Sequence, residues 1–546
     1  MKNYNICIKT ALAVFAVALS ACSSDDDIAD NSSNSQEKPV TNKTMTFRAT
    51  MDDGSGSNSK ATRTDFNGNN TIWAANDKIY ILNTADVDEK YPAGGEFTIG
   101  EPADGSNYGK EENFSGDKIK ANGSDNDQFY AYYPSSSFDT NNEVMTGNIP
   151  TVQTPTDGTY PQTLHYMTAY STNSTFNFKN VCALLKITLT GNGSTNTNPV
   201  CRVKVVANPT LSAMNAQEFT YTNIAGGFTA TIGSDGTATT TATGTKNTYV
   251  ELHAAGDNTA KTSLGNGTFY MVVLPAQLDN GFTLLLEKTD GTIYQRINAK
   301  KMAFERNKMY NLQSYDCSGT ISGMTELTNV VDLDMPSGTL WATKNLSTTR
   351  SGIIGFYTYT HDFVASETEY GDYFSYGDHY VHMTPFSTSS TKISNNTLKK
   401  EYDVAYSFDN RYCTPIYAQL YEFYNNFSND YKDSFKGNNN PNKGAKFWTS
   451  TGRYIWIPYA GHYWAANLQD RGSKGSIWSR TNAGRTLSST LSDDAYCLDL
   501  KEDDNENPVL DSHSGILDGA AEWHDNTYSG RSIRPVVTNV QIAPIL

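Results

Sequence analysis

The chain has 546 residues, which is too long for one hydrophobic core and predicts two to four domains. Hydrophobic residues make up 38% and charged residues 18%, and Gly, Thr, Asn, Ser and Tyr are abundant, which is typical of extracellular β proteins rather than helical ones. The formal net charge of −16 argues against nucleic acid as a partner, because phosphate binding needs a dense basic surface.

The first hydrophobic run ends in Leu19-Ser20-Ala21-Cys22. Two lysines precede it, and its apolar part is too short to span a bilayer, which is the layout of a secretory signal. Leu-Ser-Ala-Cys matches the lipobox of bacterial lipoproteins, and the match implies cleavage after Ala21 and lipid attachment to the Cys22 thiol. We expect a signal peptide at residues 1–21 and an outer-membrane anchor at Cys22; the alternative is an ordinary signal peptide followed by an incidental cysteine.

Residues 22–44 are rich in Ser, Asp, Asn, Gln and Pro and cannot bury apolar surface, so they predict a disordered tether. The acidic run Asp25-Asp26-Asp27 resembles the export signal that sends Bacteroidetes lipoproteins to the outer face of the outer membrane. This resemblance favours a lipid-anchored protein on the cell surface. A solvated linker is the alternative.

Between residues 45 and 315, short alternating apolar segments are separated by Gly, Asn, Asp and Pro. Such alternation, with a turn about every ten residues, is typical of β-sandwiches. The Thr-rich stretch 236–246 predicts a loop or an exposed edge strand. The clearest strand segments are 78–82, 128–133, 183–189, 202–206 and 281–286.

Short motifs in this part of the chain occur in the order of a known family. They are Ala61-Thr62-Arg63-Thr64, Trp73, Asn76-Asp77-Lys78-Ile79, Tyr130-Ala131-Tyr132-Tyr133-Pro134, Ile149-Pro150, Gln153, Met167, Phe176-Asn177-Phe178-Lys179-Asn180, Leu184-Leu185-Lys186, Val273-Leu274-Pro275-Ala276 and Arg306-Asn307-Lys308-Met309-Tyr310-Asn311-Leu312. Together they resemble the Bacteroidetes fimbrillin family (Mfa-like). The resemblance implies a mainly β fold with two tandem transthyretin-like β-sandwich domains, at residues 45–170 and 171–318, joined near Ser171.

Fimbrillins assemble after a protease removes the first strand of the acceptor subunit and a strand from another subunit replaces it. An incoming strand satisfies both the apolar groove and the unpaired backbone that the removal exposes. The resemblance therefore implies other fimbrial subunits as partners. Arg48 and Arg63 lie in the first-strand region and are the expected cleavage sites, with ordinary surface arginines as the alternative. In other family members the donor strand comes from the C-terminus, which is occupied here by a further region.

That further region is rich in aromatic residues, because six of the seven tryptophans follow residue 330. Residues 332–346, 369–377, 412–415, 455–461, 477–481 and 530–536 are similar to the major-paralogous domain family. The similarity implies an α+β, C-type-lectin-like domain at residues 325–540, with an amphipathic stretch that ends at Phe427. Cys413 and Leu346 depart from the family pattern, and residues 353–366 and 378–402 look like insertions.

In folds of this type the ligand face is built from late strands and loops, here residues 478–485, 488–499 and 522–529. Their rigid aromatic and short polar side chains suit a glycan or a protein ligand on a host or bacterial surface. Core positions for Trp478 and Trp523 are the alternative. The candidate binding residues are Trp478, Arg480, Asn482, Tyr496, Trp523, His524, Asn526 and Tyr528.

We expect no catalytic residue, cofactor or metal site, since the sequence has no C-x-x-C pair, phosphate loop, nucleophile elbow or H-E-x-x-H motif. His379-x-x-His382 and the acidic run 502–507 are weaker candidates for a metal and for calcium; a solvated loop is the favoured interpretation of the run. Two disulfide pairings, Cys413 with Cys497 and Cys182 with Cys201, stay open beside free buried thiols.

The sequence thus favours a cell-surface adhesin that is a tip or accessory subunit of a fimbrium. The alternative is a surface glycan-binding lipoprotein that does not polymerise. An enzyme related to sulfatase-modifying folds is the third reading, and no cluster of reactive cysteines supports it.

Overall fold

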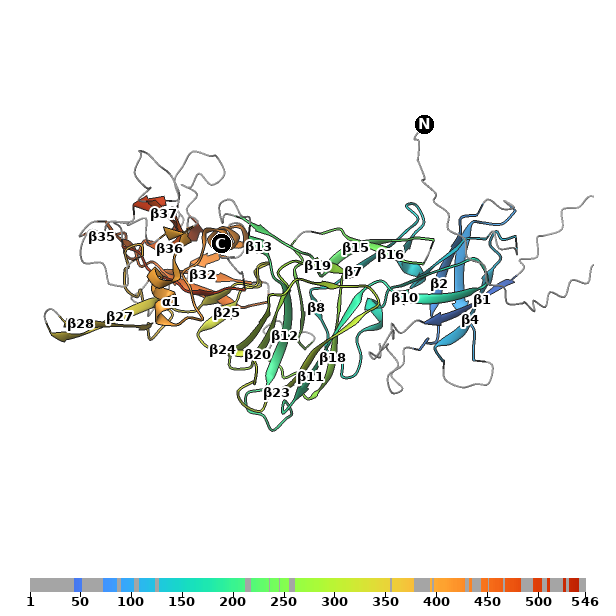
Figure 1. Cartoon of the computed structure of the whole chain (residues 1–546), viewed down its shortest axis with the longest axis horizontal. Coiled ribbons are helices and arrows are strands. Elements are labelled where there is room, and N and C mark those ends of the chain that lie inside the picture. The colour runs from blue at the N-terminus through green and yellow to red at the C-terminus, as the bar shows by residue number, and fades with distance from the viewer. Residues whose placement is uncertain are drawn as a thin grey trace, which may run out of the picture. The chain divides into compact units, whose positions relative to one another are not determined.

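The computed structural model describes most of the chain after residue 43. The described residues are 44–51, 72–85, 90–102, 108–122, 127–211, 218–234, 236–244, 246–254, 261–353, 356–377, 393–394, 397–427, 432–434, 443–449, 451–464, 467–482, 494–502, 508–510, 524–526 and 530–539 (Figure 1). The expected signal peptide, nearly all of the expected tether, Cys22 and Arg63 lie outside these ranges. Among the described helices, none is long and apolar enough to cross a membrane.

A closed barrel forms the first domain, toward the blue end of Figure 1. Its hydrogen-bonded order is β1 (Thr44–Met51), β10 (Thr175–Asn180), β9 (Met167–Ser171), β5 (Phe129–Tyr133), β2 (Lys78–Asn83), β3 (Gly94–Ile99) and β4 (Glu111–Asp117). Alternation directs one face of each strand inward, and in β1 this face carries Phe47, Ala49 and Met51. The interior is largely aromatic: the Phe47 and Phe97 rings meet edge to face, 5.1 Å apart.

Strand β1 closes the barrel because both of its edges are paired. It runs antiparallel to β4 through residues 44–50 and parallel to β10 through residues 48–51. The indole N–H of Trp73 donates a hydrogen bond of 3.1 Å to the carbonyl of Ala49, which ties β1 to the core. The hydrogen bonding of this domain therefore closes into a barrel, where the sequence resemblance implied a transthyretin-like β-sandwich.

The boundary expected near Ser171 falls inside this barrel, between β9 and β10. Phe176 and Phe178 of β10 are buried in the barrel core, so the chain returns to the first domain after residue 171. The two domains also interleave, since β7 (Val144–Ile149) precedes β9 in the chain yet pairs with β15 (Gly226–Ile232) of the second domain. The expected boundary coincides with the end of strand β9 and not with the end of the domain. Sequence composition does not show to which domain the next strand belongs.

The second domain contains three main sheets around one apolar core. The first has the order β24 (Thr325–Leu327), β21 (Ile293–Asn298), β20 (Phe282–Lys288), β12 (Val200–Ala207), β17 (Tyr249–Leu252) and β8 (Val152–Gln153). The second is β18 (Gly267–Val273), β11 (Ala183–Thr190) and β23 (Met309–Asp316), and the third is β16 (Ala238–Ala242), β15, β7 and β6 (Phe138–Asp139). Two short pairs complete it, β13 (Thr210–Leu211) with β14 (Phe219–Thr220) and β19 (Ala276–Leu278) with β22 (Met302–Phe304).

The strands expected from alternation are present. Segments 78–82, 128–133, 183–189, 202–206 and 281–286 lie within β2, β5, β11, β12 and β20, except that residues 128 and 281 each precede their strand by one position. The Thr-rich stretch contains β16, which pairs with β15 alone and is the edge strand of its sheet. The prediction of a mainly β protein is confirmed.

The described residues of the C-terminal region form small sheets and two α-helices. Its elements are β25 (Val330–Asp332), β26 (Leu340–Ala342), β27 (Leu346–Ile353), β28 (Phe356–Phe363), β29 (Ile393–Ser394), β30 (Thr397–Leu398), α1 (Val404–Phe408), α2 (Tyr417–Phe427), β31 (Lys432–Ser434), β32 (Gly444–Trp448), β33 (Tyr454–Pro458), β34 (His462–Trp464), β35 (Asn467–Gln469), β36 (Lys474–Asn482), β37 (Asp494–Glu502), β38 (Pro508–Leu510), β39 (His524–Asn526) and β40 (Val536–Val537). The principal sheet joins β29, β30, β36, β37 and β38, and β39 also pairs with β37.

Helix α2 forms where the sequence has an amphipathic stretch. Leu420, Phe423 and Phe427 recur at helical spacing and are buried in the C-terminal core against Phe447. At its start, the Gln419 side chain accepts a hydrogen bond of 2.9 Å from the backbone N–H of Ile416. The helix therefore supplies one apolar face to the core of this region.

The five cysteines in the described part of the chain are all free and buried, at positions 182, 201, 317, 413 and 497. Neither pairing left open by the sequence, Cys413 with Cys497 or Cys182 with Cys201, forms a disulfide. Burial raises the pKa of Cys413 to about 11 and that of Cys182 to about 12. These thiols act as small apolar side chains.

Candidate functional site at the domain junction

Two of the predicted ligand-binding residues are core residues. The Trp478 side chain is 1% exposed, and its indole N–H donates a 2.7 Å hydrogen bond to the carbonyl of Phe374. Arg480 is 5% exposed, and its guanidinium lies 3.9 Å from the Asp403 carboxylate. Residues 475–481 of β36 are all buried, which agrees with the alternative of a core position for Trp478.

The other predicted binding residues lie on neighbouring strands or outside the described residues. Asn482 is at the end of β36, opposite Ala495 of β37, and β37 pairs with β39, which places Tyr496 opposite His524. In the same ladder Asn526 lies opposite residue 494. The Tyr496 ring is half-buried and lies 4.4 Å from the Tyr417 ring of α2. Trp523 and Tyr528, like His379, His382 and residues 503–507, lie outside the described part of the chain.

Charged residues that the sequence analysis did not single out meet between the second domain and the C-terminal region. The cluster comprises Arg202, Lys204, Glu251, Glu287, Asp332, Asp334 and Arg453. Arg202 and Lys204 extend from β12, and the two aspartates belong to β25 and the residues just after it. Apart from Asp334, every member is at least nine-tenths buried. We refer to these seven residues as the junction cluster.

Each cation in the junction cluster forms an ion pair with a carboxylate on the opposite side, that is, between the second domain and the C-terminal region. Arg202 Nη1 lies 3.0 Å from Glu251 and 2.7 Å from Asp332. Lys204 Nζ lies 2.9 Å from Asp332 and 2.8 Å from Asp334. Three cations thus face four carboxylates, so the charges nearly balance.

The electrostatics of the junction cluster depend on this balance. Burial by itself raises the pKa of the Asp332 carboxyl, but Lys204, Arg202 and Arg453 hold that pKa well below its ordinary value. Burial also works against the charged form of Lys204, yet the neighbouring carboxylates Asp332 and Asp334 raise its pKa. Burying such charges away from water costs free energy unless each is paired. Any displacement of the second domain against the C-terminal region would leave charges unpaired, so the ion pairs fix how these two parts fit together.

Further contacts join the second domain to the C-terminal region. The Tyr221 hydroxyl donates a 2.8 Å hydrogen bond to the Glu422 carboxylate of α2, and the Thr248 hydroxyl donates one of 2.6 Å to the carbonyl of Pro336. Strand β24, which leads into the C-terminal region, pairs with β21 of the second domain. The junction is therefore continuous in backbone pairing, hydrogen bonds and ion pairs.

Glu422 has a carboxyl pKa shifted toward neutral pH. Burial raises the pKa of its carboxyl to about 7, although Ser337 and Tyr221 donate hydrogen bonds that lower it. The backbone N–H of Ser337 lies 2.8 Å from Oε1 of Glu422. Its proton therefore titrates near neutral pH.

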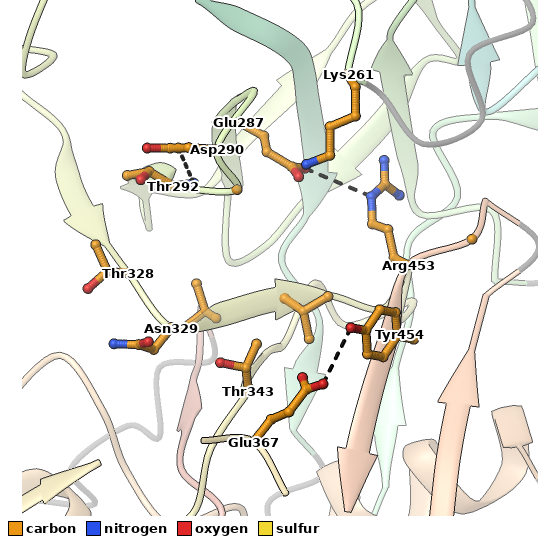
Figure 2. Close-up of a pocket in the computed structure, with 14 residues that line it drawn as sticks. Lys261, Glu287, Asp290, Thr292, Thr328, Asn329, Thr343, Glu367, Arg453 and Tyr454 are labelled. Atoms are coloured by element: carbon orange, nitrogen blue, oxygen red, sulfur yellow. Dashed lines mark hydrogen bonds and ion pairs between the residues drawn. The ribbon is translucent and has the colours of Figure 1, made fainter. Parts of the chain in front are cut away.

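A cavity of about 540 Å³ opens beside the junction cluster (Figure 2). Its lining combines two cations, three carboxylates, hydroxyls, an amide, one tyrosine and two valines. The residues are Lys261, Glu287, Asp290, Gly291, Thr292, Thr328, Asn329, Val330, Val331, Thr343, Glu367, Gly452, Arg453 and Tyr454. In the described part of the chain, no group of three or more His, Cys, Asp or Glu side chains is arranged to hold a metal ion.

The cleavage candidate Arg48 lies within β1, where its neighbours on both edges are paired. Its side chain is exposed and forms an ion pair with Glu111 of β4. Its backbone N–H donates a 2.8 Å hydrogen bond to the carbonyl of Ser174. Arg48 is therefore a surface residue of an intact strand.

Residues 60–314 match the family described as fimbrillin-like, so the resemblance seen in the sequence is confirmed for this part of the chain. Comparison with curated protein sequences gives no match. The chain is similar to a proposed cell adhesion protein of Bacteroides uniformis, with 19% identity and a TM-score of 0.31 over 52% of this chain and 97% of that chain.

Two fimbrial proteins are also similar in structure. The tip fimbrial protein of Porphyromonas gingivalis with a C-terminal truncation has 9% identity and a TM-score of 0.25, over 52% of this chain and 97% of that chain. A fimbrial protein of Bacteroides ovatus has 10% identity and a TM-score of 0.19, over 86% of this chain and 95% of that chain. The family match ends within β23, before the C-terminal region begins.

Proposed function

We propose that the protein is a cell-surface adhesive subunit of a fimbrium and occupies an end of the fibre. The fimbrillin-like match over residues 60–314 supports a fimbrial role. The observation that carries the proposal is the position of β1, which completes the barrel and precedes the matched residues. In this proposal β1 is the strand that assembly replaces.

The barrel chemistry supports such a replacement. Phe47, Ala49 and Met51 are the buried residues of β1, and its two edges carry backbone hydrogen bonds to β4 and β10. A barrel without β1 exposes an apolar groove between two unpaired strand edges, and any strand with matching alternation fills it. Removal of β1 therefore creates an acceptor.

We propose Arg63 rather than Arg48 as the processing site. A protease needs an extended segment free of strand pairing, and Arg48 lies where both neighbouring strands are paired. Cleavage at Arg48 therefore requires β1 to open first. Cleavage after Arg63 separates β1 from the barrel strands that follow it, β2 onward, and breaks no ladder among the described residues.

The C-terminal side supports an acceptor that does not donate. Strand β40 pairs with β26, and Val536 exchanges two backbone hydrogen bonds of 2.9 Å with Cys413. The Asn539 amide donates a 2.9 Å hydrogen bond to Asn208 of the second domain. The described C-terminal strand is therefore paired within this subunit, which supports our proposal of an acceptor that does not donate it.

The remaining parts of the proposal concern location and recognition. Lipid at Cys22 carries the precursor to the outer membrane, and cleavage then exchanges this anchor for a place in the fibre. The C-terminal region, C-type-lectin-like in our interpretation, recognises a glycan or protein on another cell. Its proposed loop face contains Asn482, Tyr496, His524 and Asn526, with Trp523 and Tyr528 close in sequence.

The test is the N-terminus of the protein in isolated surface fibres, read by mass spectrometry. An N-terminus at Thr64 supports assembly after cleavage at Arg63, and one at Ala49 supports assembly with cleavage at Arg48. Monomers that all retain a lipidated Cys22 contradict the proposal. That result favours a surface lipoprotein that does not polymerise.

A further inference from the structure

We propose that the cavity beside the junction cluster binds a neutral oligosaccharide. This inference rests on the proposed adhesive function and gives it a site away from the loop face expected from the sequence. The cavity lies where residues of the second domain and of the C-terminal region meet, so neither part forms it alone (Figure 2).

The size of the cavity suits a short glycan. Its volume of about 540 Å³ lies within the range typical of small-molecule sites. The second domain and the C-terminal region are joined here by paired strands and buried ion pairs, so the cavity is pre-formed. A pre-formed site loses less conformational entropy when a ligand binds.

The lining offers hydrogen-bonding groups of both kinds. Thr328, Thr343 and Thr292 provide hydroxyls that donate and accept, and Asn329 provides an amide. Asn329 has a φ of 56°, in the left-handed region that asparagine tolerates. Sugar hydroxyls likewise donate and accept, so this lining matches a polyhydroxylated ligand better than an apolar one.

An aromatic ring and an apolar floor complete the match. Tyr454 is 38% exposed, and its hydroxyl lies 3.4 Å from the Glu367 carboxylate at the cavity (Figure 2). Lys446 Nζ lies 3.8 Å from the centre of the Tyr454 ring and holds it in place. Val330 and Val331 supply apolar surface for the C–H face of a pyranose.

The charges favour a neutral glycan over an acidic one. Three carboxylates, Glu287, Asp290 and Glu367, face two cations, Lys261 and Arg453. A phosphate or a sialic acid carboxylate needs an excess of positive charge, which this lining lacks. Sialylated and phosphorylated ligands are therefore disfavoured.

Arg453 adds donors that the protein leaves without an acceptor. Its side chain lines the cavity and is buried, and its Nε and Nη2 atoms make no hydrogen bond among the described residues. They lie 3.8 Å from Glu287 and 3.9 Å from Glu251, which is too far for hydrogen bonds. A hydroxyl of a bound sugar supplies the missing acceptor once the guanidinium shifts slightly toward it.

The experiment applies the full chain to an array of neutral and sialylated oligosaccharides and measures the Kd of each neutral ligand bound. Two variants change the cavity, Tyr454→Ala and Glu367→Gln. Tyr406→Ala is the matched control, because Tyr406 is half-buried in α1 of the same region and also lies under a lysine, 5.2 Å from Lys400 Nζ. Thermal unfolding checks that each variant remains folded.

We expect binding to neutral glycans that weakens about tenfold in each cavity variant and is unchanged in Tyr406→Ala. Equal binding by all four proteins overturns the assignment and moves recognition to another face. A wild-type protein that binds only sialylated glycans, or none on the array, also overturns it. The N-terminus in fibres is measured separately, so failure of this site is distinguishable from failure of the fimbrial role.

Discussion

Both the barrel and the junction contain buried apolar contacts, and the junction adds buried ion pairs to them. In the barrel, β1 contributes Phe47, Ala49 and Met51 to an apolar core and ordinary backbone pairing to its edges. In the junction, Arg202 and Lys204 meet their carboxylates in fixed pairs. An apolar groove accepts any strand with the right alternation, whereas a buried charge accepts only its own partner. The comparison is consistent with our proposal that β1 is exchangeable, whereas the junction is a permanent joint.

The largest effect is expected from Arg202→Met. The substitution leaves Glu251, Glu287 and Asp332 without their shared guanidinium, and uncompensated buried charges destabilise by about 3–5 kcal/mol. Urea unfolding followed by tryptophan fluorescence measures the loss, since six of the seven tryptophans lie after residue 330.

Arg350→Met is the matched control, because Arg350 is an exposed residue of β27. Its effect should stay within about 0.5 kcal/mol. If the two variants unfold at the same urea concentration, the junction cluster does not hold the two parts together.

The next effect concerns β1, the strand that we propose is replaced during assembly. Phe47→Ala removes a fully buried ring from β1 and should cost about 3–4 kcal/mol of barrel stability. Hydrogen exchange read by mass spectrometry should show faster exchange across residues 44–51. Thr46→Ala, at an exposed position of β1, serves as the control, and equal exchange in both variants argues against an apolar role for Phe47.

Glu422 gives the junction a pH dependence of intermediate size. Its folded-state pKa of about 7 lies above its ordinary value of 4.5, so the folded protein retains a proton that the unfolded chain releases. Its contribution is therefore most favourable below pH 4.5 and becomes less favourable by about 2–3 kcal/mol as the pH rises to 7. Glu422→Gln should flatten the stability curve over this window; an unchanged curve contradicts the assigned titration.

The strands were predictable because their apolar residues alternate, as in residues 78–82, where Ile79 and Ile81 are buried. The same rule misleads at β12. Alternation of Arg202 and Lys204 with valines predicts outward-facing charges, yet all eight residues of β12 are buried because a second region covers that face. The alternating carboxylates of Asp332-Leu333-Asp334 match the alternating cations of β12, and this match was the available signal for the ion pairs. It could not be used from sequence alone, because Arg202 and Asp332 lie 130 residues apart in the chain.

The expected ligand face was less predictable for a related reason. Trp478 and Arg480 have residue types common in binding sites, but β36 is covered on both sides. Sequence composition reports what a side chain can do and not whether it reaches solvent. The sequence gives no signal for the cavity beside Tyr454, because its lining comes from separate segments between residues 261 and 454.

The smallest effect is expected from reduction. The five described cysteines are free, so dithiothreitol should leave the unfolding temperature unchanged. Burial raises the pKa of Cys413 to about 11 and that of Cys317 to about 11, so neither thiol should react with iodoacetamide in the folded protein at pH 8. A lower unfolding temperature after reduction would show that a disulfide stabilises the protein, which contradicts the free cysteines of this structure.

The most direct test of the comparison is strand replacement. A variant carries a unique protease sequence in place of residues 60–65 and, after cleavage, is incubated with a fluorescent peptide of the β1 sequence, residues 44–51. We predict that the peptide displaces β1 and binds the barrel, while hydrogen exchange at Arg202 and Asp332 stays slow. Retention of β1 without peptide binding, or opening of the junction before the barrel, contradicts the proposed roles of the two regions.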